Sequence, residues 1–273
     1  MIIGMRGHDF GKLEPSVLAK EIAKNGFAAT QLAFIKAFPE SEENYLTEDG
    51  LKEVRKIFAD EGLKVPVMGC YVSASDADPA VLEKAKARFS RFLECSILLG
   101  AGCVGTETTP FTFPESEREA AYQRLLDFTK SAVETAKKCG AIVGIEPVAR
   151  HTLNTPELTL RLLNDVNDPH LNVILDTANL LTPTTCDPEI QMDLLDRSLR
   201  YFGDKVCALH VKDGFFNDEG KWQNRPLGEG VMDWEHLFPR LNAKLGHLCA
   251  LRENVWPGYA AEECKIMKRW AEL

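Results

Sequence analysis

The stretch Cys139-Gly140-Ala141-Ile142-Val143-Gly144-Ile145-Glu146 carries the pattern that decides the fold. A helical segment ends at a glycine, a short run of apolar and β-branched residues follows, and that run ends at a charged residue. The segment before it is helical in period, because one helical face is formed by Leu125, Leu126, Thr129, Val133 and Ala136. The stretch therefore predicts a helix followed by a strand.

The same pattern, a helical segment that ends at glycine and is followed by a short apolar run, recurs along the chain. Candidate strands lie at residues 2–5, 28–32, 63–67, 103–105, 141–145, 171–175, 205–209 and 247–251. Each is followed by a helical segment, and eight successive βα units in a chain of 273 residues match a (β/α)8 barrel. We predict an α/β fold with one (β/α)8 TIM barrel domain over residues 1–273. A doubly wound open sheet is the structural alternative.

Several local signals refine this prediction. Asp78, Thr155 and Asp187 each precede a proline and are expected to cap a helix with their side chains. The longest connection without clear periodicity runs from residue 213 to residue 232, after the seventh strand. At that place in a barrel it lies on the catalytic face, where long loops often serve as lids or binding loops.

Composition narrows the classes of partner. Hydrophobic residues make up 45% of the chain, and the formal net charge is −9, which argues against a nucleic-acid partner. No apolar run approaches the roughly 20 residues of a membrane span, and the N-terminus shows no signal-length apolar run, so a cytoplasmic protein without membrane contact is expected. The eight cysteines are scattered without a C-x-x-C pair and are expected to be reduced structural thiols.

Polar residues end four successive predicted strands. The fifth strand ends at Glu146, the sixth at Asp176, the seventh at His210 and the eighth leads into Glu253. The carboxyl ends of barrel strands converge on one mouth, so these side chains are expected to meet there. Three buried carboxylates repel one another unless a cation joins them. Oxygen ligands with one imidazole suit Mn2+ first, or Mg2+, Co2+ or Zn2+, so we predict one divalent metal ion.

Four segments carry a resemblance to a known family. They are Gly144-Ile145-Glu146-Pro147, Leu175-Asp176-Thr177-Ala178-Asn179, Leu209-His210-Val211-Lys212-Asp213 and Pro226-Leu227-Gly228-Glu229-Gly230. The chain resembles the xylose isomerase-like TIM barrels of the sugar phosphate isomerase and epimerase family over nearly its whole length. The resemblance implies a single metal ion on Glu146, Asp176, His210 and Glu253, with Glu146 and Glu253 also acting as catalytic acid and base.

A metal-dependent isomerase or epimerase of a keto-sugar or related polyol ketone follows from this set. A cation that chelates the substrate carbonyl and its neighbouring hydroxyl stabilises the enediolate formed on deprotonation. Glu146 and Glu253 then move the proton, one removing it and the other returning it. A metal-dependent dehydratase or lyase of a keto-polyol, similar to inosose dehydratases or acting on a 3-keto glycoside, is the alternative within the enzymes. A non-catalytic sugar-binding module is the alternative outside them.

Further residues near the predicted mouth are candidates for binding a carbohydrate substrate: His8, Glu107, His151, Lys212 and Arg225. Each also has an ordinary structural interpretation as a hydrogen-bonded or surface side chain.

Two departures from the family bear on the function. Ketose epimerases similar to this chain commonly have another acid shortly after the strand-five glutamate, where residues 148–152 supply none, and many have histidine where Asn179 stands. The extra metal-binding histidines of apurinic-site endonucleases are lacking, which argues against a nuclease. The resemblance is compatible with a homo-oligomer.

Overall fold

The computed structural model describes residues 1–272, and its centre is a closed barrel of eight parallel strands. The neighbours around the ring are β1, β10, β7, β6, β5, β4, β3 and β2, so the last strand in the chain pairs with the first. The bounds are β1 Ile2–Arg6, β2 Ala29–Leu32, β3 Lys64–Gly69, β4 Cys103–Glu107, β5 Val143–Glu146, β6 Leu171–Asp176, β7 Val206–Val211 and β10 Cys249–Arg252. The predicted TIM barrel is confirmed.

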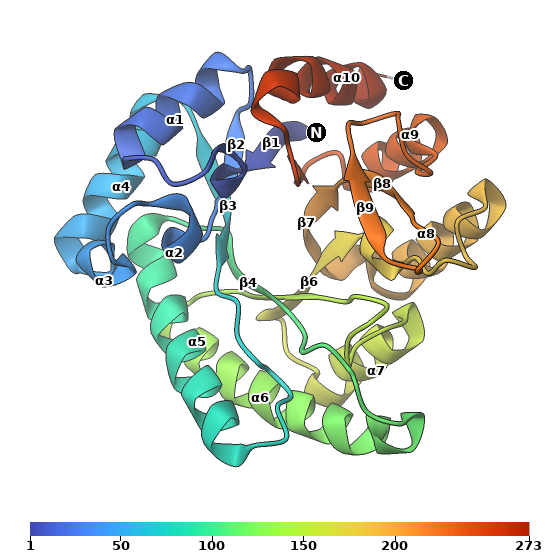
Figure 1. The fold of residues 1–273 in the computed structure, drawn as a ribbon. Coiled ribbons are helices and arrows are strands. Elements are labelled where there is room, and N and C mark those ends of the chain that lie inside the picture. Colours follow the sequence, from blue (N-terminus) through green and yellow to red (C-terminus); the bar gives the residue numbers. More distant parts are fainter. Residues whose placement is uncertain (273) are drawn as a thin grey trace.

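One long helix follows each barrel strand, and the helices surround the strands as an outer ring (Figure 1). They are α1 Pro15–Lys24, α4 Glu48–Asp60, α5 Pro79–Leu99, α6 Arg118–Cys139, α7 Pro156–Val166, α8 Pro188–Phe202, α9 Trp234–Leu245 and α10 Ala260–Glu272. Two short helices, α2 Phe34–Ala37 and α3 Glu42–Tyr45, lie between β2 and α4. Within residues 1–272, every helix is too short or too polar to cross a membrane.

All three predicted helix starts are confirmed, and the side-chain cap is confirmed at two of them. The side chain of Asp78 accepts a hydrogen bond from the backbone N–H of Ala80, and that of Thr155 accepts one from Leu158. Asp187 does precede α8, but its side chain makes no capping hydrogen bond, so the expectation of a side-chain cap there is wrong. The backbone carbonyl of Asp187 accepts from the N–H of Gln191, so the backbone of Asp187 starts the helix while its side chain takes no part.

The core has two layers, as a (β/α)8 barrel requires. The larger layer fills the space between strands and helices, and a smaller cluster fills the inside of the barrel with Ala29, Val67, Cys103, Ile174, Ala208, Cys249 and Leu251. A Cβ atom on Gly105 would lie 2.7 Å from side-chain carbons of both Val67 and Ile174. Only glycine fits there, because the interior of the barrel is packed and is not a channel.

The connection at residues 213–232 differs from the aperiodic loop that the sequence predicted. It contains a two-stranded antiparallel hairpin of β8 Asp213–Phe216 and β9 Trp222–Arg225, which lies directly after β7 (Figure 1). The buried carboxylate of Asp213 anchors the rest of the connection by accepting hydrogen bonds from the backbone N–H groups of Gly228 and Met232. Pairing by backbone groups and anchoring by one distant carboxylate leave little trace in hydrophobic periodicity, which is why the hairpin escaped prediction.

Candidate active site

The four predicted metal ligands all lie at the mouth of the barrel, and all are buried. Glu146 and Asp176 are the last residues of β5 and β6, His210 is the penultimate residue of β7, and Glu253 follows β10 directly. One ligand atom each from Glu146, Asp176 and His210 lies within 4.8 Å of the others. Oε1 of Glu253 lies 3.4 Å from Nδ1 of His210, so the fourth side chain reaches the same group.

His210 is oriented by a residue of β2, which β10 and β1 separate from β7 in the ring. Its Nε2 lies 2.7 Å from Oε1 of Gln31 in β2, and the Nε2 of Gln31 donates in turn to the hydroxyl of Tyr71. Since an amide oxygen only accepts, Nε2 of His210 carries the hydrogen. The other ring nitrogen, Nδ1, therefore faces Oε2 of Glu146 at 3.2 Å and Oε1 of Glu253 at 3.4 Å. A second partner that sets the tautomer in this way is typical of metal-binding histidines.

Nδ1 of His210 is also the atom that tests whether these residues fit a cation. It is buried and has no hydrogen-bond partner among residues 1–272. Burial lowers the pKa of His210, but the carboxylates of Glu253, Glu146 and Asp176 outweigh that effect and raise the pKa to about 9. The negative potential of the three carboxylates that raises this pKa also attracts a divalent cation, which displaces the proton on binding, so the donor set fits the predicted metal ion.

Two basic residues complete the charge balance of the site. Nζ of Lys212 lies 2.9 Å from Oδ2 of Asp176 and 3.2 Å from Oε2 of Glu253. Arg6 at the end of β1 approaches Oε1 of Glu253 at 3.4 Å. Burial raises the pKa of Glu253, but His210, Lys212 and Arg6 together hold it below the usual value of a glutamate. Glu253 is therefore ionised at neutral pH.

Asn179 connects two of the predicted ligands. Its Nδ2 donates to Oε1 of Glu146 at 2.6 Å, and its backbone N–H donates to Oδ1 of Asp176 at 3.0 Å. The residue that departs from the family pattern thus orients Glu146 and leaves the ligand set intact.

Asn254, directly after Glu253, ties the mouth to the hairpin. It adopts a left-handed backbone conformation with φ of 61°, which asparagine tolerates better than most residues. Its Oδ1 accepts from Arg6 at 2.6 Å, and its Nδ2 donates to Oδ1 of Asn224 on β9 at 3.2 Å. Gln31, Arg6 and Asn254 are not among the residues predicted from the sequence. Arg6 is the last residue of β1, so the same strand-end criterion would have found it, whereas Gln31 stands one position before the end of β2 and would have been missed.

A cavity of about 170 Å³ opens beside the four ligands and is the candidate substrate pocket. It is lined by residues from the loops after five barrel strands and from the hairpin: Glu107, Val148, Arg150, Ala178, Asn179, Leu181, Lys212, Phe216, Trp222, Asn224 and Asn254. Glu107 and Lys212 are thus two predicted substrate-binding residues that the structure brings to one pocket. Burial and the neighbouring Glu146 raise the pKa of Glu107 to about 7.

The other predicted substrate-binding residues lie outside the lining of this pocket. The ring of buried His151 lies 3.8 Å from the carboxylate of Glu107, and burial lowers its pKa to about 4. His8 follows β1 in a short turn, and burial together with Arg6 lowers its pKa to about 3. Arg225 packs its guanidinium over the ring of Phe215 at 4.6 Å. The substrate-binding roles of His8, His151 and Arg225 stay predictions.

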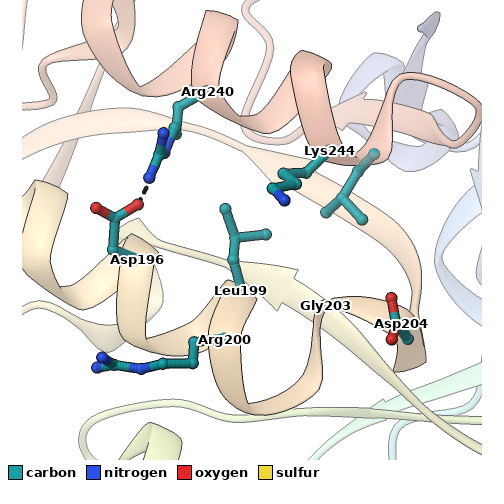
Figure 2. A pocket seen from close by; sticks show the side chains of 8 residues that line it. Asp196, Leu199, Arg200, Gly203, Asp204, Arg240 and Lys244 are labelled. Carbon is teal, nitrogen blue, oxygen red and sulfur yellow. Dashed lines mark hydrogen bonds and ion pairs between the residues drawn. The ribbon is translucent and has the colours of Figure 1, made fainter.

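A second cavity, of about 390 Å³, lies between α8 and α9, away from the mouth (Figure 2). Its lining includes Leu199, Arg200 and Lys244, and an ion pair between Arg240 and Asp196 crosses its edge. None of the predicted site residues lines it.

Residues 19–270 match the family model described as xylose isomerase-like TIM barrel. The chain belongs to this family. The match confirms the resemblance found in the sequence and covers most of the barrel.

Two curated relatives of this xylose isomerase-like barrel are sugar epimerases. The L-ribulose-5-phosphate 3-epimerase UlaE of Escherichia coli O157:H7 is 29% identical over 119 residues, which are 44% of this chain and 38% of that protein. The D-psicose 3-epimerase of Enterocloster bolteae is 24% identical over 239 residues, which are 82% of this chain and 69% of that protein. The first match therefore spans well under half of the relative's length.

Solved structures similar to this xylose isomerase-like barrel confirm the fold. The 3-keto-D-glucoside 4-epimerase YcjR of E. coli superposes with a TM-score of 0.78 at 16% identity, covering 98% of this chain and 99% of that one. The IOLI protein, solved with a bound zinc atom, superposes with a TM-score of 0.75 at 16% identity, covering 99% and 96%.

Proposed function

We propose that this chain is a divalent-metal-dependent epimerase or isomerase of a keto-sugar or a related polyol ketone. One observation carries the proposal: carboxylate oxygens of Glu146 and Glu253 lie 3.2 and 3.4 Å from the same nitrogen of His210. These glutamates come from β5 and the end of β10, which are separated in the ring by β6 and β7. Two carboxylates therefore approach one point from two sides of the mouth, as two-sided proton transfer requires.

Glu146, Asp176, His210 and Glu253 would hold the metal ion, and the oxygen-rich donor set favours Mn2+ among the divalent candidates. Their three carboxylates face buried Lys212 and half-buried Arg6, so the site keeps negative charge for a divalent ion once His210 is neutral. When bound, that ion supplies Lewis-acid polarisation of the substrate carbonyl and so acidifies the neighbouring C–H. The zinc atom in the IOLI structure and the buried donor set of this chain support the assignment.

The side chains of the protein then carry the proton. One glutamate removes the proton from the carbon next to the carbonyl, and the other delivers a proton to the opposite face of that carbon, which inverts it. Delivery to the adjacent carbon isomerises the substrate instead. Asn179 holds the carboxylate of Glu146, and Lys212 and Arg6 hold that of Glu253, so both groups are positioned before substrate enters.

The pocket lining supports a carbohydrate as the substrate. Phe216 and Trp222 provide aromatic rings, which pack against the apolar faces of sugars, and the amides of Asn179, Asn224 and Asn254 can bond to hydroxyl groups. The names of the two curated relatives, one acting on a free ketohexose and one on a phosphorylated pentulose, indicate which compounds to test first.

Solvent proton exchange tests the proposal directly. The protein is incubated with MnCl2 in D2O, with D-psicose or L-ribulose 5-phosphate, and deuterium at the substrate carbons is followed by NMR. We expect incorporation with wild-type protein and loss of at least about 100-fold of the rate in Glu146→Gln and Glu253→Gln, the range for removing a positioned acid or base. Glu229→Gln, at an exposed loop position, is the matched control and should exchange normally. Equal exchange in all four proteins would overturn the proposal.

A dehydratase or lyase is the second candidate, and Glu107 favours it. This carboxyl lines the pocket, and its pKa of about 7 leaves a large protonated fraction that can protonate a departing β-hydroxyl. Mass spectrometry of the same reactions separates the two functions, because only dehydration removes a molecule of water. A protein that binds these sugars, holds Mn2+ and exchanges no deuterium would instead be a sugar-binding module.

A further inference from the structure

We propose that Cys103 and Cys207 form a redox-active dithiol inside the barrel, which reacts with a low-molecular-weight disulfide to give an intramolecular disulfide between β4 and β7. All eight cysteines are free thiols in the structure. Cys103 and Cys207 differ from the other cysteines because their Sγ atoms are in contact at 3.7 Å, although 104 positions separate them in sequence.

A β-bulge brings the two thiols together. In the pairing of β6 with β7, Val173 aligns with Val206 and Ile174 aligns with Ala208, so Cys207 is the extra residue on its strand. Regular alternation would point Cys207 away from Ala208, which belongs to the cluster inside the barrel. A bulge re-aims a side chain, and here the Sγ of Cys207 reaches both the carbonyl oxygen of Val173 and the Sγ of Cys103.

The two thiols differ in access, as an attacking and a resolving cysteine do. Cys103 is buried, with 1% of its surface exposed, whereas Cys207 is half-buried. The contact with Cys207 and burial raise the pKa of the Cys103 thiol, so Cys103 is held as the thiol under reducing conditions. An oxidant therefore meets Cys207 first.

The chemistry is thiol–disulfide exchange with oxidised glutathione as the oxidant. The thiolate of Cys207 attacks one sulfur of glutathione disulfide, a mixed disulfide forms, and one reduced glutathione leaves. The thiolate of Cys103 then attacks the Sγ of Cys207, a second reduced glutathione leaves, and the protein has lost two hydrogen atoms. A disulfide needs an S–S distance of about 2.05 Å, so the sulfurs must approach by less than 2 Å. The bulged residue can supply that movement because it is unpaired in the ladder.

The two cysteines lie at the amino-terminal ends of β4 and β7, opposite the mouth, so the dithiol is separate from the metal ligands. The cross-link would nevertheless enclose β5 and β6, which carry Glu146 and Asp176. Closing so long a loop restricts the unfolded chain, so the oxidised protein should unfold at a temperature several degrees higher.

Peptide mapping by mass spectrometry after treatment with glutathione disulfide tests the proposal on the intact wild-type protein. We expect a cross-linked peptide pair containing Cys103 and Cys207, reversed by dithiothreitol. Cys103→Ser should instead retain a glutathione adduct on Cys207. Cys186, half-buried and without another thiol in contact among residues 1–272, is the internal control and should keep its adduct in both proteins.

Two results would overturn the dithiol. One is a stable glutathione adduct on Cys207 of the wild type, which would mean that Cys103 cannot resolve it. The other is an unmodified Cys207 in a sample where Cys186 has reacted, which would mean that Cys207 is not reactive. Neither result bears on the proposed metal-dependent activity.

Discussion

The Nε2 atom of His210 lies 2.7 Å from Oε1 of Gln31, and this contact decides which ring nitrogen of the histidine faces the carboxylates. The two residues come from β7 and β2, on different sides of the barrel.

Replacing Gln31 should therefore weaken metal binding while the fold is kept. Gln31→Leu removes the acceptor and frees the histidine to adopt the other tautomer. We expect the affinity for Mn2+, measured by isothermal titration calorimetry, to fall by about 10–100-fold, the usual effect of losing such a partner. Gln31→Glu retains an acceptor and should recover most of the affinity. Gln223→Leu, on the exposed side of the hairpin, is the control; an equal loss there would contradict the explanation.

Removal of Lys212 should make the stability of the folded protein more dependent on bound metal. Lys212→Met removes the cation shared by buried Asp176 and Glu253 and leaves Asp176 without a Lys or Arg partner among residues 1–272, which typically costs about 3–5 kcal/mol of unfolding free energy. Added Mn2+ should then stabilise the variant more than the wild type, because the ion replaces the missing charge. Urea unfolding with and without MnCl2 measures both effects. Exposed Lys244→Met is the control. If Mn2+ does not stabilise Lys212→Met more than the wild type, the electrostatic role is disproved.

The burial of His151 should make the folded protein less stable at acid pH. Burial lowers its pKa from the ordinary value of 6.5 to about 4, so the folded protein excludes a proton that the unfolded chain accepts. The contribution of His151 to the free energy of unfolding is fully present above pH 6.5 and is lost as the pH falls towards 4. The slope of this loss is at most about 1.4 kcal/mol per pH unit. His151→Gln should flatten this part of the curve of unfolding free energy against pH.

His236 provides a control of opposite sign for that experiment. Its exposed ring pairs with Asp233, which raises its pKa, so its contribution is present at low pH and is lost as the pH rises through the folded pKa. His236→Gln should leave the acid limb, where His151 titrates, unchanged. If both histidine variants flatten that limb equally, burial of His151 is not the cause.

The pair of Arg252 and Glu263 should be a main structural support of the mouth. Both side chains are buried, their atoms lie 2.8 and 3.0 Å apart at two contacts, and Glu263 also accepts from the backbone of Leu227. Glu263→Gln leaves a buried guanidinium without its counter-charge and should cost about 3–5 kcal/mol in urea unfolding. Exposed Glu262→Gln should change the stability by less than about 1 kcal/mol. Similar values for the two variants would contradict this role.

The barrel and the convergence of the candidate ligands could be predicted from the sequence because both depend on local pattern and on chain direction. Alternation of apolar runs with capped helices marks eight βα units, and all parallel strands end at one mouth, so Glu146, Asp176 and His210 had to converge there. Neither inference needs the orientation of any single side chain.

Only the tertiary structure decided the contacts between side chains of different barrel strands. Gln31 meets His210, Arg6 meets Glu253 and Cys207 meets Cys103 only after ring closure brings distant strands together. The hairpin after β7 likewise depends on backbone pairing and on Asp213. Periodicity records which face of an element is apolar, whereas partners on other strands and one-residue bulges are set by the packing of the whole ring.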